Sequence, residues 1–261
     1  MASSDVLASV VARYEAAIAK SGVIRQARGR LGRSDVRPSY QDAQDLAGEA
    51  GRLLGQIMAE ELSAAYTDEE PMTEADALAI IPPALRRNHD FVNAYTQRMQ
   101  QMQNRDARLP ATAPDMPFDK DRADGIAVSA ARTEKLSEHL EALRDQIETN
   151  ARIDVDEALE EQAAIHEEMG LFPHIVRVAD PNCCAWCSER AGEVEYRPGM
   201  DTEIFRRHAN CRCLITYEPA RSKDARRLER FGRKMTDTSP KRIERRIRQG
   251  SDILEGLSRM T

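Results

Sequence analysis

The sequence predicts a mainly α-helical fold, with long helices and a small zinc-stabilised α+β module near the C-terminus. Three observations lead to this prediction. Charged residues make up 31% of the 261 residues and aromatic residues only 5%, which suits elongated, solvent-rich helices better than a thick core. Apolar residues recur at helical spacing through most of the chain before residue 170. All five cysteines lie between residues 183 and 213, next to short segments rich in β-branched residues.

Two helical segments are expected first. Ser3 or Ser4 can cap a helix that ends near residues 29–32, with Leu7, Val11, Tyr14 and Ile18 on its inward face. A second helix runs from about Ser39 to Tyr66. Its interior glycines each cost about 1 kcal/mol relative to alanine, and their spacing of three and four places them on one side. This spacing indicates the close approach of another helix to Gly48, Gly51 and Gly55.

A third helical segment begins at Thr73 and carries apolar residues in alternating steps of three and four, as in a heptad repeat. We expect this face to pack within the molecule rather than against a second copy, because the run barely exceeds three heptads. Pro82-Pro83 should break or restart the helix. His89 beside the seam is interpreted as a solvated residue.

A proline-rich stretch with Pro110, Pro114 and Pro117 cannot be helical and is the best linker in the sequence. A long helix with Leu136, Leu140, Leu143 and Ile147 inward should follow it. Another helix should run from about Asp154 to Met169 and end at Gly170. The glutamates of this last helix spread around it and are interpreted as a solvated face, and His139 and His166 as structural or surface residues.

The segments 172–179, 194–196 and 214–217 are predicted to be strands of a small sheet around the cysteines. Such a sheet is too small to be stable without a metal ion. The predicted organisation is therefore a helical N-terminal region (1–107), a proline-rich linker (108–119), a helical segment plus zinc module (120–219, the module being 171–219) and a basic helical tail (220–261).

The cysteines follow the spacing C-x2-C, twenty residues, then H-x2-C-x-C. Zinc takes four thiolate or imidazole donors in a tetrahedron, and two knuckles of closely spaced ligands can supply them. The candidate ligands are Cys184, Cys187, His208, Cys211 and Cys213. Five donors for four positions leave one unused, and His208 or Cys211 is the expected one. Cys183 is also within ligand spacing of Cys187, but Cys184 fits better.

Other interpretations of the cluster are weaker. An odd number of cysteines without a secretory signal argues against disulfides, and no βαβ pattern precedes Cys184 as in thioredoxin-like redox pairs. No acid or oxyanion loop can be recognised for a Cys–His nucleophile pair. The motifs G-x-x-x-x-G-K, H-E-x-x-H and G-x-S-x-G are absent. We therefore expect a structural zinc site and no catalytic residues, so the protein is not expected to be an enzyme.

Charge is distributed unevenly. Residues 220–261 hold 13 Lys/Arg and 6 Asp/Glu, whereas the preceding residues hold 25 and 38. Ile243, Ile247, Leu254 and Leu257 of this tail have heptad-like spacing, which predicts a basic amphipathic helix. Its candidate contacts to nucleic acid or an acidic protein surface are Arg242, Arg245, Arg246 and Arg248, although a helix docked on the body explains the pattern equally well. Arg206 and Arg207 either contact phosphate or neutralise the thiolates. No apolar run approaches membrane-spanning length, so we expect a soluble protein without a membrane partner.

The cysteine-rich stretch resembles the C-terminal signature of the phage Mu F-like minor head proteins, also called phage head morphogenesis or minor capsid proteins. The resemblance rests on Trp186-Cys187, the Ala191-Gly192 turn and the segment from His208 to Pro219, which reads H-A-N-C-R-C-L-I-T-Y-E-P. The segment 176–180 takes the position of a strand that ends in an acid. Ala209 departs from the family, which usually has proline there, without removing a ligand. Residues 131–134 also resemble a short helical motif of the family. The match covers about 45 of the 261 residues.

The resemblance implies a minor head protein that acts in head morphogenesis, joins the portal and is retained in the virion. Its partners would be portal and capsid proteins, with packaged DNA as a further one. It would reside in the host cytoplasm during assembly and then inside the head. The alternative from the residues alone is a zinc-containing nucleic-acid-binding protein that uses the basic C-terminal helix.

Overall fold

The computed structural model describes residues 2–33, 35–133, 135–208 and 210–218. The chain forms long helices followed by a small sheet, so the predicted fold class is confirmed. The elements in order are α1 (Ser3–Lys20), α2 (Gly22–Leu31), α3 (Tyr40–Ala65), α4 (Glu74–Asp106), α5 (Lys120–Ala131), α6 (Leu136–Glu168), β1 (His174–Val178), α7 (Ala185–Glu189), β2 (Gly192–Glu195), the 3-10 helix η1 (Thr202–Ile204) and β3 (Leu214–Glu218).

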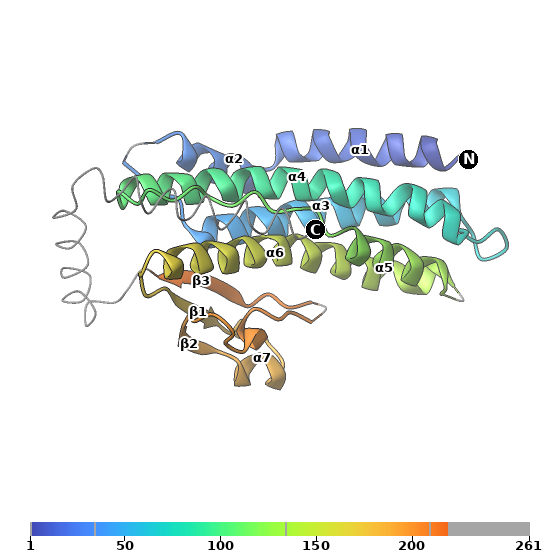
Figure 1. The fold of residues 1–261 in the computed structure, drawn as a ribbon. Coiled ribbons are helices and arrows are strands. Elements are labelled where there is room, and N and C mark those ends of the chain that lie inside the picture. Colours follow the sequence, from blue (N-terminus) through green and yellow to red (C-terminus); the bar gives the residue numbers. More distant parts are fainter. Residues whose placement is uncertain (1, 34, 134, 209, 219–261) are drawn as a thin grey trace, which may run out of the picture.

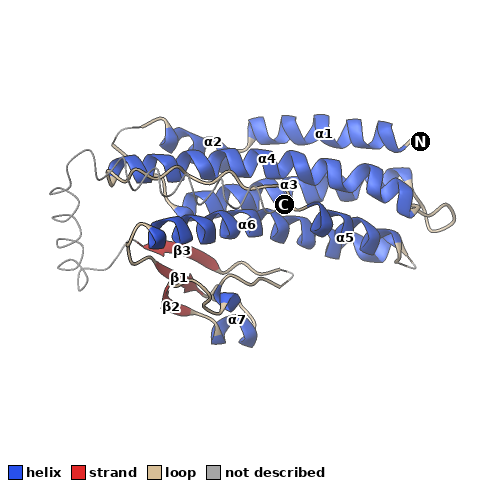
Figure 2. Cartoon of the chain, viewed as in Figure 1, coloured by secondary structure: helices blue, strands red, loops and turns tan. Residues whose placement is uncertain are grey.

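The long helices lie side by side in an elongated bundle, and the sheet packs on one side of it, beside α6 (Figure 1). Figure 2 shows the three strands and α7 gathered on the side of the bundle away from α1. Among the helices that the structure describes, none combines the length and the apolar character needed to cross a membrane.

The first predicted helix is divided in two, so the expectation of one helix up to residues 29–32 is wrong. Ser21 leaves the helical conformation with ψ 127°, and its hydroxyl accepts a hydrogen bond from the backbone N–H of Ile24, which caps α2. Serine competes well for this position because its side chain satisfies a free backbone donor. Ser3 does not cap α1 but lies inside it. The buried face of α1 is Val6, Val10, Tyr14 and Ile18.

The glycines of α3 mark its closest contact with α6, as predicted. A Cβ atom on Gly51 would lie 2.7 Å from the Cα atom of Glu148, and one on Gly55 would lie 3.0 Å from the backbone of Arg144. At Gly48 the neighbour is the guanidinium of Arg152. The helices can approach this closely only because glycine has no side chain, which explains why helix-weakening glycines occupy these positions.

Helix α4 continues through Pro82 and Pro83, so the predicted break is wrong. Two interior prolines cost about 6 kcal/mol at about 3 kcal/mol each. Ile80, Ile81 and Leu85 beside them are completely buried, which stabilises the helix by roughly 5–9 kcal/mol. Tertiary packing therefore offsets the local preference. The predicted heptad face of α4 is buried within the bundle, which confirms intramolecular packing.

His89 of α4 is 3% exposed, so its interpretation as a solvated residue is wrong. Its Nε2 atom lies 3.0 Å from the carbonyl oxygen of Met116, and Nδ1 lies 3.3 Å from a carboxylate oxygen of Asp154. Burial by itself lowers the pKa of His89, but these two acceptors outweigh it and hold the pKa above its usual value. His89 thus joins α4 to α6 and to the segment before α5.

The residues between α4 and α5 are not helical, as predicted, and they pack back along α4. The backbone N–H of Ala113 donates to Gln101, and that of Met116 donates to Asn93. The helices after this segment have other boundaries than expected. A short helix, α5, comes first, and α6 runs without interruption through Asp154, where a new helix was predicted. Gly170 follows α6 with φ 80°, the left-handed conformation expected at a helix C-terminus.

The sheet has the order β2-β1-β3, and both pairs are antiparallel. Ile175 of the central strand pairs with Val194 and with Tyr217. Ile175 and Ile215 are completely buried and belong to the same hydrophobic core as the helices. The hydroxyl of Tyr217 lies 2.7 Å from Nδ1 of His166 on α6. The sheet and the bundle therefore share one core, and the cysteines lie at its margin.

Candidate metal centre

Two short segments bring the predicted donors together. Cys184 is the N-cap of α7 and Cys187 lies one turn further on, so both sulfurs are on the same side of this helix. The other donors lie in the connection between η1 and β3. Asn210 has φ 63° there, and the N–H of Cys211 bonds to the carbonyl of His208 at 3.1 Å. Asparagine tolerates this left-handed conformation better than most residues. The tight turn directs His208 and Cys211 toward α7.

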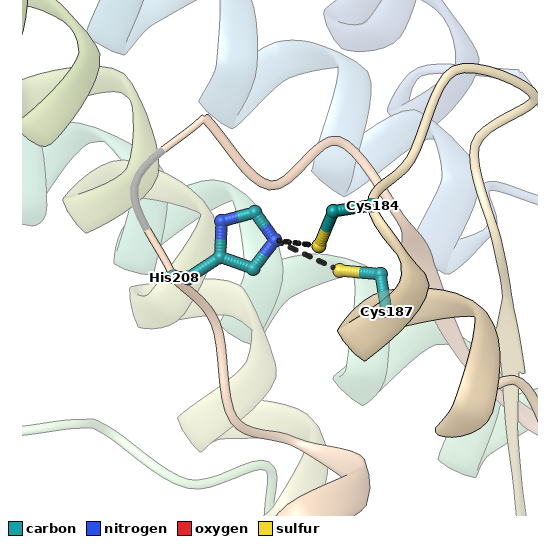
Figure 3. Close-up of side chains that lie close together, drawn as sticks. All are labelled: Cys184, Cys187 and His208. Atoms are coloured by element: carbon teal, nitrogen blue, oxygen red, sulfur yellow. Dashed lines mark hydrogen bonds between the residues drawn. The ribbon is translucent and has the colours of Figure 1, made fainter.

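The donor atoms form two groups that share Cys187: Cys184, Cys187 and His208 in one, and Cys187, Cys211 and Cys213 in the other. Nε2 of His208 lies 3.2 Å from the sulfur of Cys184 and 3.1 Å from that of Cys187 (Figure 3). The sulfurs of Cys187 and Cys211 are 3.6 Å apart. A tetrahedral zinc ion would separate its donors by about 3.6–3.8 Å, as follows from its bond lengths. Each group could hold a metal ion after shifts of a few tenths of an ångström.

All five predicted donors lie in this cluster. One donor was expected to be unused, either His208 or Cys211, but both belong to the cluster. His208 contacts the sulfurs of Cys184 and Cys187, and Cys211 contacts the sulfur of Cys187. Cys183 belongs to neither group, although it packs against the buried cysteines.

The buried thiols influence one another. Burial raises the pKa of Cys187 to about 12, and its hydrogen bonds to Cys211 and Cys213 act in the same direction. Burial also acts to raise the pKa of Cys213, but the backbone N–H of Asp180 and the neighbouring thiols donate to its sulfur, and its pKa lies below the usual value. A cluster of three buried thiols has few acceptors for its protons. Metal binding removes this difficulty because it takes the thiols as thiolates.

Arg177 holds the two halves of the cluster together, and sequence reasoning missed it. It lies on β1 and is 1% exposed. Its Nη2 atom donates to the sulfurs of both Cys187 and Cys211 at 3.4 Å, and Nη1 donates to the carbonyls of Ile204 and Arg206 at 2.9 and 2.7 Å. The sequence did contain a signal. Arg177 is two residues after the buried Ile175, which places an arginine on the inward face of an apolar strand.

Arg207 connects the cluster to the helices. Its side chain is completely buried and forms an ion pair with Asp156 of α6. Its Nη1 atom donates to the carbonyls of Cys211 and Cys213 at 3.2 and 2.8 Å, and contacts the sulfur of Cys211 at 3.8 Å. Burial raises the pKa of Asp156, and Arg207 opposes this effect. Of the two roles considered for Arg207, phosphate contact is wrong because the guanidinium is not accessible. Neutralising the thiolates agrees with its position.

Trp186 covers one side of the cluster. Its ring meets that of His208 edge to face with 5.5 Å between centroids, and the guanidinium of Arg190 stacks on it at 3.9 Å. Arg206, by contrast, is exposed and pairs with Glu203 at 2.9 Å. The other candidate contact residues, Arg242, Arg245, Arg246 and Arg248, lie outside the described residues.

Comparison of the chain with protein-family models, with curated proteins and with solved structures finds no match. The arrangement of the residues therefore has to be interpreted from its own chemistry. It places three sulfur and nitrogen donors within reach of one ion in each of two groups, beside the buried side chains of Arg177 and Arg207.

Proposed function

We propose that the cysteine–histidine cluster holds a structural zinc ion. The observation that carries this proposal is the convergence of the C-x2-C and H-x2-C-x-C segments on Cys187. Thiolate and imidazole donors suit zinc better than the oxygen-seeking cations, and zinc accepts a tetrahedral arrangement readily. The two groups together contain five donors, so one ion bound beside Cys187 would take all four of its ligands from the protein and leave no position open for water or substrate. The ion would therefore stabilise the module rather than catalyse a reaction.

We also propose that the chain is a phage minor head protein that acts in head morphogenesis, associates with the portal and stays in the virion. Its support is the resemblance of the segment from Trp186 to Pro219 to the Mu F-like signature. The donors of that segment lie together in the fold rather than apart, as a metal-binding signature requires. An elongated helical body with a compact module at its side offers two separate surfaces for assembly (Figure 1).

The zinc proposal is tested on the full-length protein by elemental analysis. We expect close to one zinc per chain. Cys187→Ser should lose the metal, because Cys187 belongs to both donor groups and a serine hydroxyl is a poor zinc ligand. Cys183→Ser is the matched control and should retain it, because Cys183 belongs to neither group. Equal zinc content in the two variants, or no zinc in the wild type, would contradict the proposal.

The assembly proposal is tested on phage particles purified from cells in which the gene is expressed with its neighbouring head genes. Mass spectrometry should detect the wild-type chain and Cys183→Ser in the particles, whereas Cys187→Ser should be missing. Portal and terminase genes beside this gene are also expected. Absence of the wild-type chain from the particles would refute a virion role. Equal incorporation of both variants would show that the metal centre is not needed for assembly.

Nucleic-acid binding is the second candidate function, because residues 220–261 hold 13 Lys/Arg against 6 Asp/Glu. DNA binding through such a segment should weaken steeply with salt, since each phosphate contact releases counterions. Titration of DNA at several salt concentrations, with and without residues 220–261, measures this. Binding that is steeply salt-dependent and lost on truncation would favour this function over portal attachment.

A further inference from the structure

Three buried charged side chains meet beside the cysteines, and their charges do not cancel. Arg177, Arg207 and Asp156 are each at most 2% exposed at the side chain or residue level. Asp156 pairs with Arg207. Within the described part of the chain, no second carboxylate forms a hydrogen bond or an ion pair with either guanidinium. The group therefore has one excess positive charge in a buried environment, where an uncompensated charge is costly.

The arginines direct their remaining donors at sulfur. Arg177 donates to Cys187 and Cys211, and Arg207 contacts Cys211 as well. Hydrogen bonds of this kind are stronger when the acceptor carries a negative charge. The missing negative charge therefore belongs on the sulfurs.

We propose that the buried arginines select a ligand set of three thiolates and His208. This inference rests on the proposed zinc ion. A divalent ion with three thiolates and one neutral imidazole has a net charge of minus one, which cancels the excess charge of the arginine group. Four thiolates would leave the site with one uncompensated negative charge. His208 is within reach of this role because its Nε2 atom lies 3.1 Å from the sulfur of Cys187.

The same contacts restrict which thiol is left out. Cys187 belongs to both donor groups, and Cys211 is held by both arginines. The cysteine outside the ligand set is therefore Cys184 or Cys213. Arg177 acts as a positioning residue, because its Nη2 atom fixes one sulfur from each knuckle while its Nη1 atom anchors the intervening loop through two carbonyls.

X-ray absorption spectroscopy on the zinc-loaded full-length protein tests the ligand set. The spectrum should fit three sulfurs and one nitrogen around the ion. His208→Ala should change this ratio and weaken zinc binding. A wild-type spectrum with four sulfurs, or unchanged binding after His208→Ala, would overturn the ligand set while leaving the zinc proposal intact. A wild-type protein without metal would instead refute the zinc proposal itself.

Competition with a chromophoric chelator tests Arg177. Arg177→Met removes the charge and the hydrogen bonds but keeps a long side chain, and the zinc affinity should fall by about 10–100-fold, as for other residues that orient metal ligands. Arg190→Met is the matched control. Both guanidiniums lie over the ring of Trp186, but Arg190 donates to Glu203 and to the carbonyl of Trp186 and not to the sulfurs, so the affinity should be unchanged.

Circular dichroism verifies that each variant keeps its helices. If Arg177→Met does not fold, Arg177→Lys replaces it, since lysine keeps the charge but cannot bridge the two sulfurs and both carbonyls. Its affinity should then be lower than that of the wild type, and the sulfur-to-nitrogen ratio should stay at three to one. Wild-type affinity in a folded Arg177 variant would overturn the role of Arg177.

Discussion

Replacement of Gly51 by alanine tests the packing of α3 on α6. The new Cβ atom would lie 2.7 Å from the Cα atom of Glu148, 3.0 Å from the Cβ atom of Ala151 and 3.1 Å from the carbonyl oxygen of Ile147. Carbon atoms in contact are normally about 3.5–4.0 Å apart. None of these neighbours is the end of a flexible side chain. The two helices must therefore separate locally to accept the methyl group.

The magnitude follows from two opposing effects. Alanine in a helix is more stable than glycine by roughly 0.5–1 kcal/mol. Overpacking a tight contact costs about 1–3 kcal/mol, and a rigid backbone neighbour places this contact in the upper part of that range. We therefore expect Gly51→Ala to lower the free energy of unfolding by about 1–2 kcal/mol.

Gly125→Ala is the matched control, because Gly125 lies within α5 and a Cβ atom there has no neighbour within 4 Å. Only the helix preference acts at this position, so the variant should be more stable by roughly 0.5–1 kcal/mol. Urea unfolding of the full-length protein, followed by circular dichroism, measures both variants. If Gly51→Ala were stabilised as much as Gly125→Ala, the close approach of α3 and α6 would be refuted.

Three further predictions concern buried polar groups. Burial lowers the pKa of His166 from 6.5 to about 4. The free energy of unfolding of the wild type should therefore fall by up to about 3 kcal/mol as the pH drops between these values. His166→Gln should remove this pH dependence in acid unfolding titrations. His89 has a raised pKa in the folded protein, so the stability that it contributes should be present below pH 6.5 and lost as the pH rises through that raised pKa. If His89→Gln left this loss of stability with rising pH unchanged, the prediction would be contradicted. Asp156→Asn leaves Arg207 buried without its charged partner and should lower the free energy of unfolding by about 3–5 kcal/mol. Glu60→Gln, in an exposed ion pair, should change it little. Similar urea midpoints for the two variants would refute the buried ion pair of Asp156 and Arg207.

Much of the fold could be predicted because local signals agree with the packing. Ser39 and Thr73 begin α3 and α4, and each forms a capping box with the aspartate three residues later. The glycine positions in α3 predicted a helix contact, which α6 provides. β1 and β3 also lie where β-branched residues gather, and β2 contains the predicted strand residue Val194.

Two of the failed predictions, the helix break at Pro82-Pro83 and the solvated position of His89, have the same physical reason: tertiary burial outweighed local preference. Pro82 and Pro83 stay in a helix because their apolar neighbours fill the core. His89 is polar and lies beside the seam, but Asp154 and Met116 satisfy it inside the bundle. Spacing alone cannot show which distant residue will supply a partner, so single-sequence reasoning assigns such residues to the surface.

For the site, spacing identified the donors but not what surrounds them. Knuckle motifs are local, and their ligands can be read from the sequence. Arg177 lies 10 residues before Cys187, the nearer of the two donors that it contacts, and Asp156 lies 51 residues before Arg207, through which it is connected to the cluster. The strand and the helix that carry them have no metal-binding signature. Their role arises from topology, because β1 is the central strand and α6 supports the sheet.

The metal centre and the helical body are therefore not independent. Arg207 bonds to the carbonyls of the closing knuckle and to Asp156, while Gln44 of α3 donates to the same carboxylate at 2.6 Å. Without the proposed ion, the positive charges of Arg177 and Arg207 would face protonated thiols, and the contact between the sheet and α6 would be destabilised. Because Ile175 and Ile215 belong to the core of the bundle, this loss of stability would extend from the sheet to the helices. Metal binding should therefore stabilise the packing of α3, α6 and the sheet together.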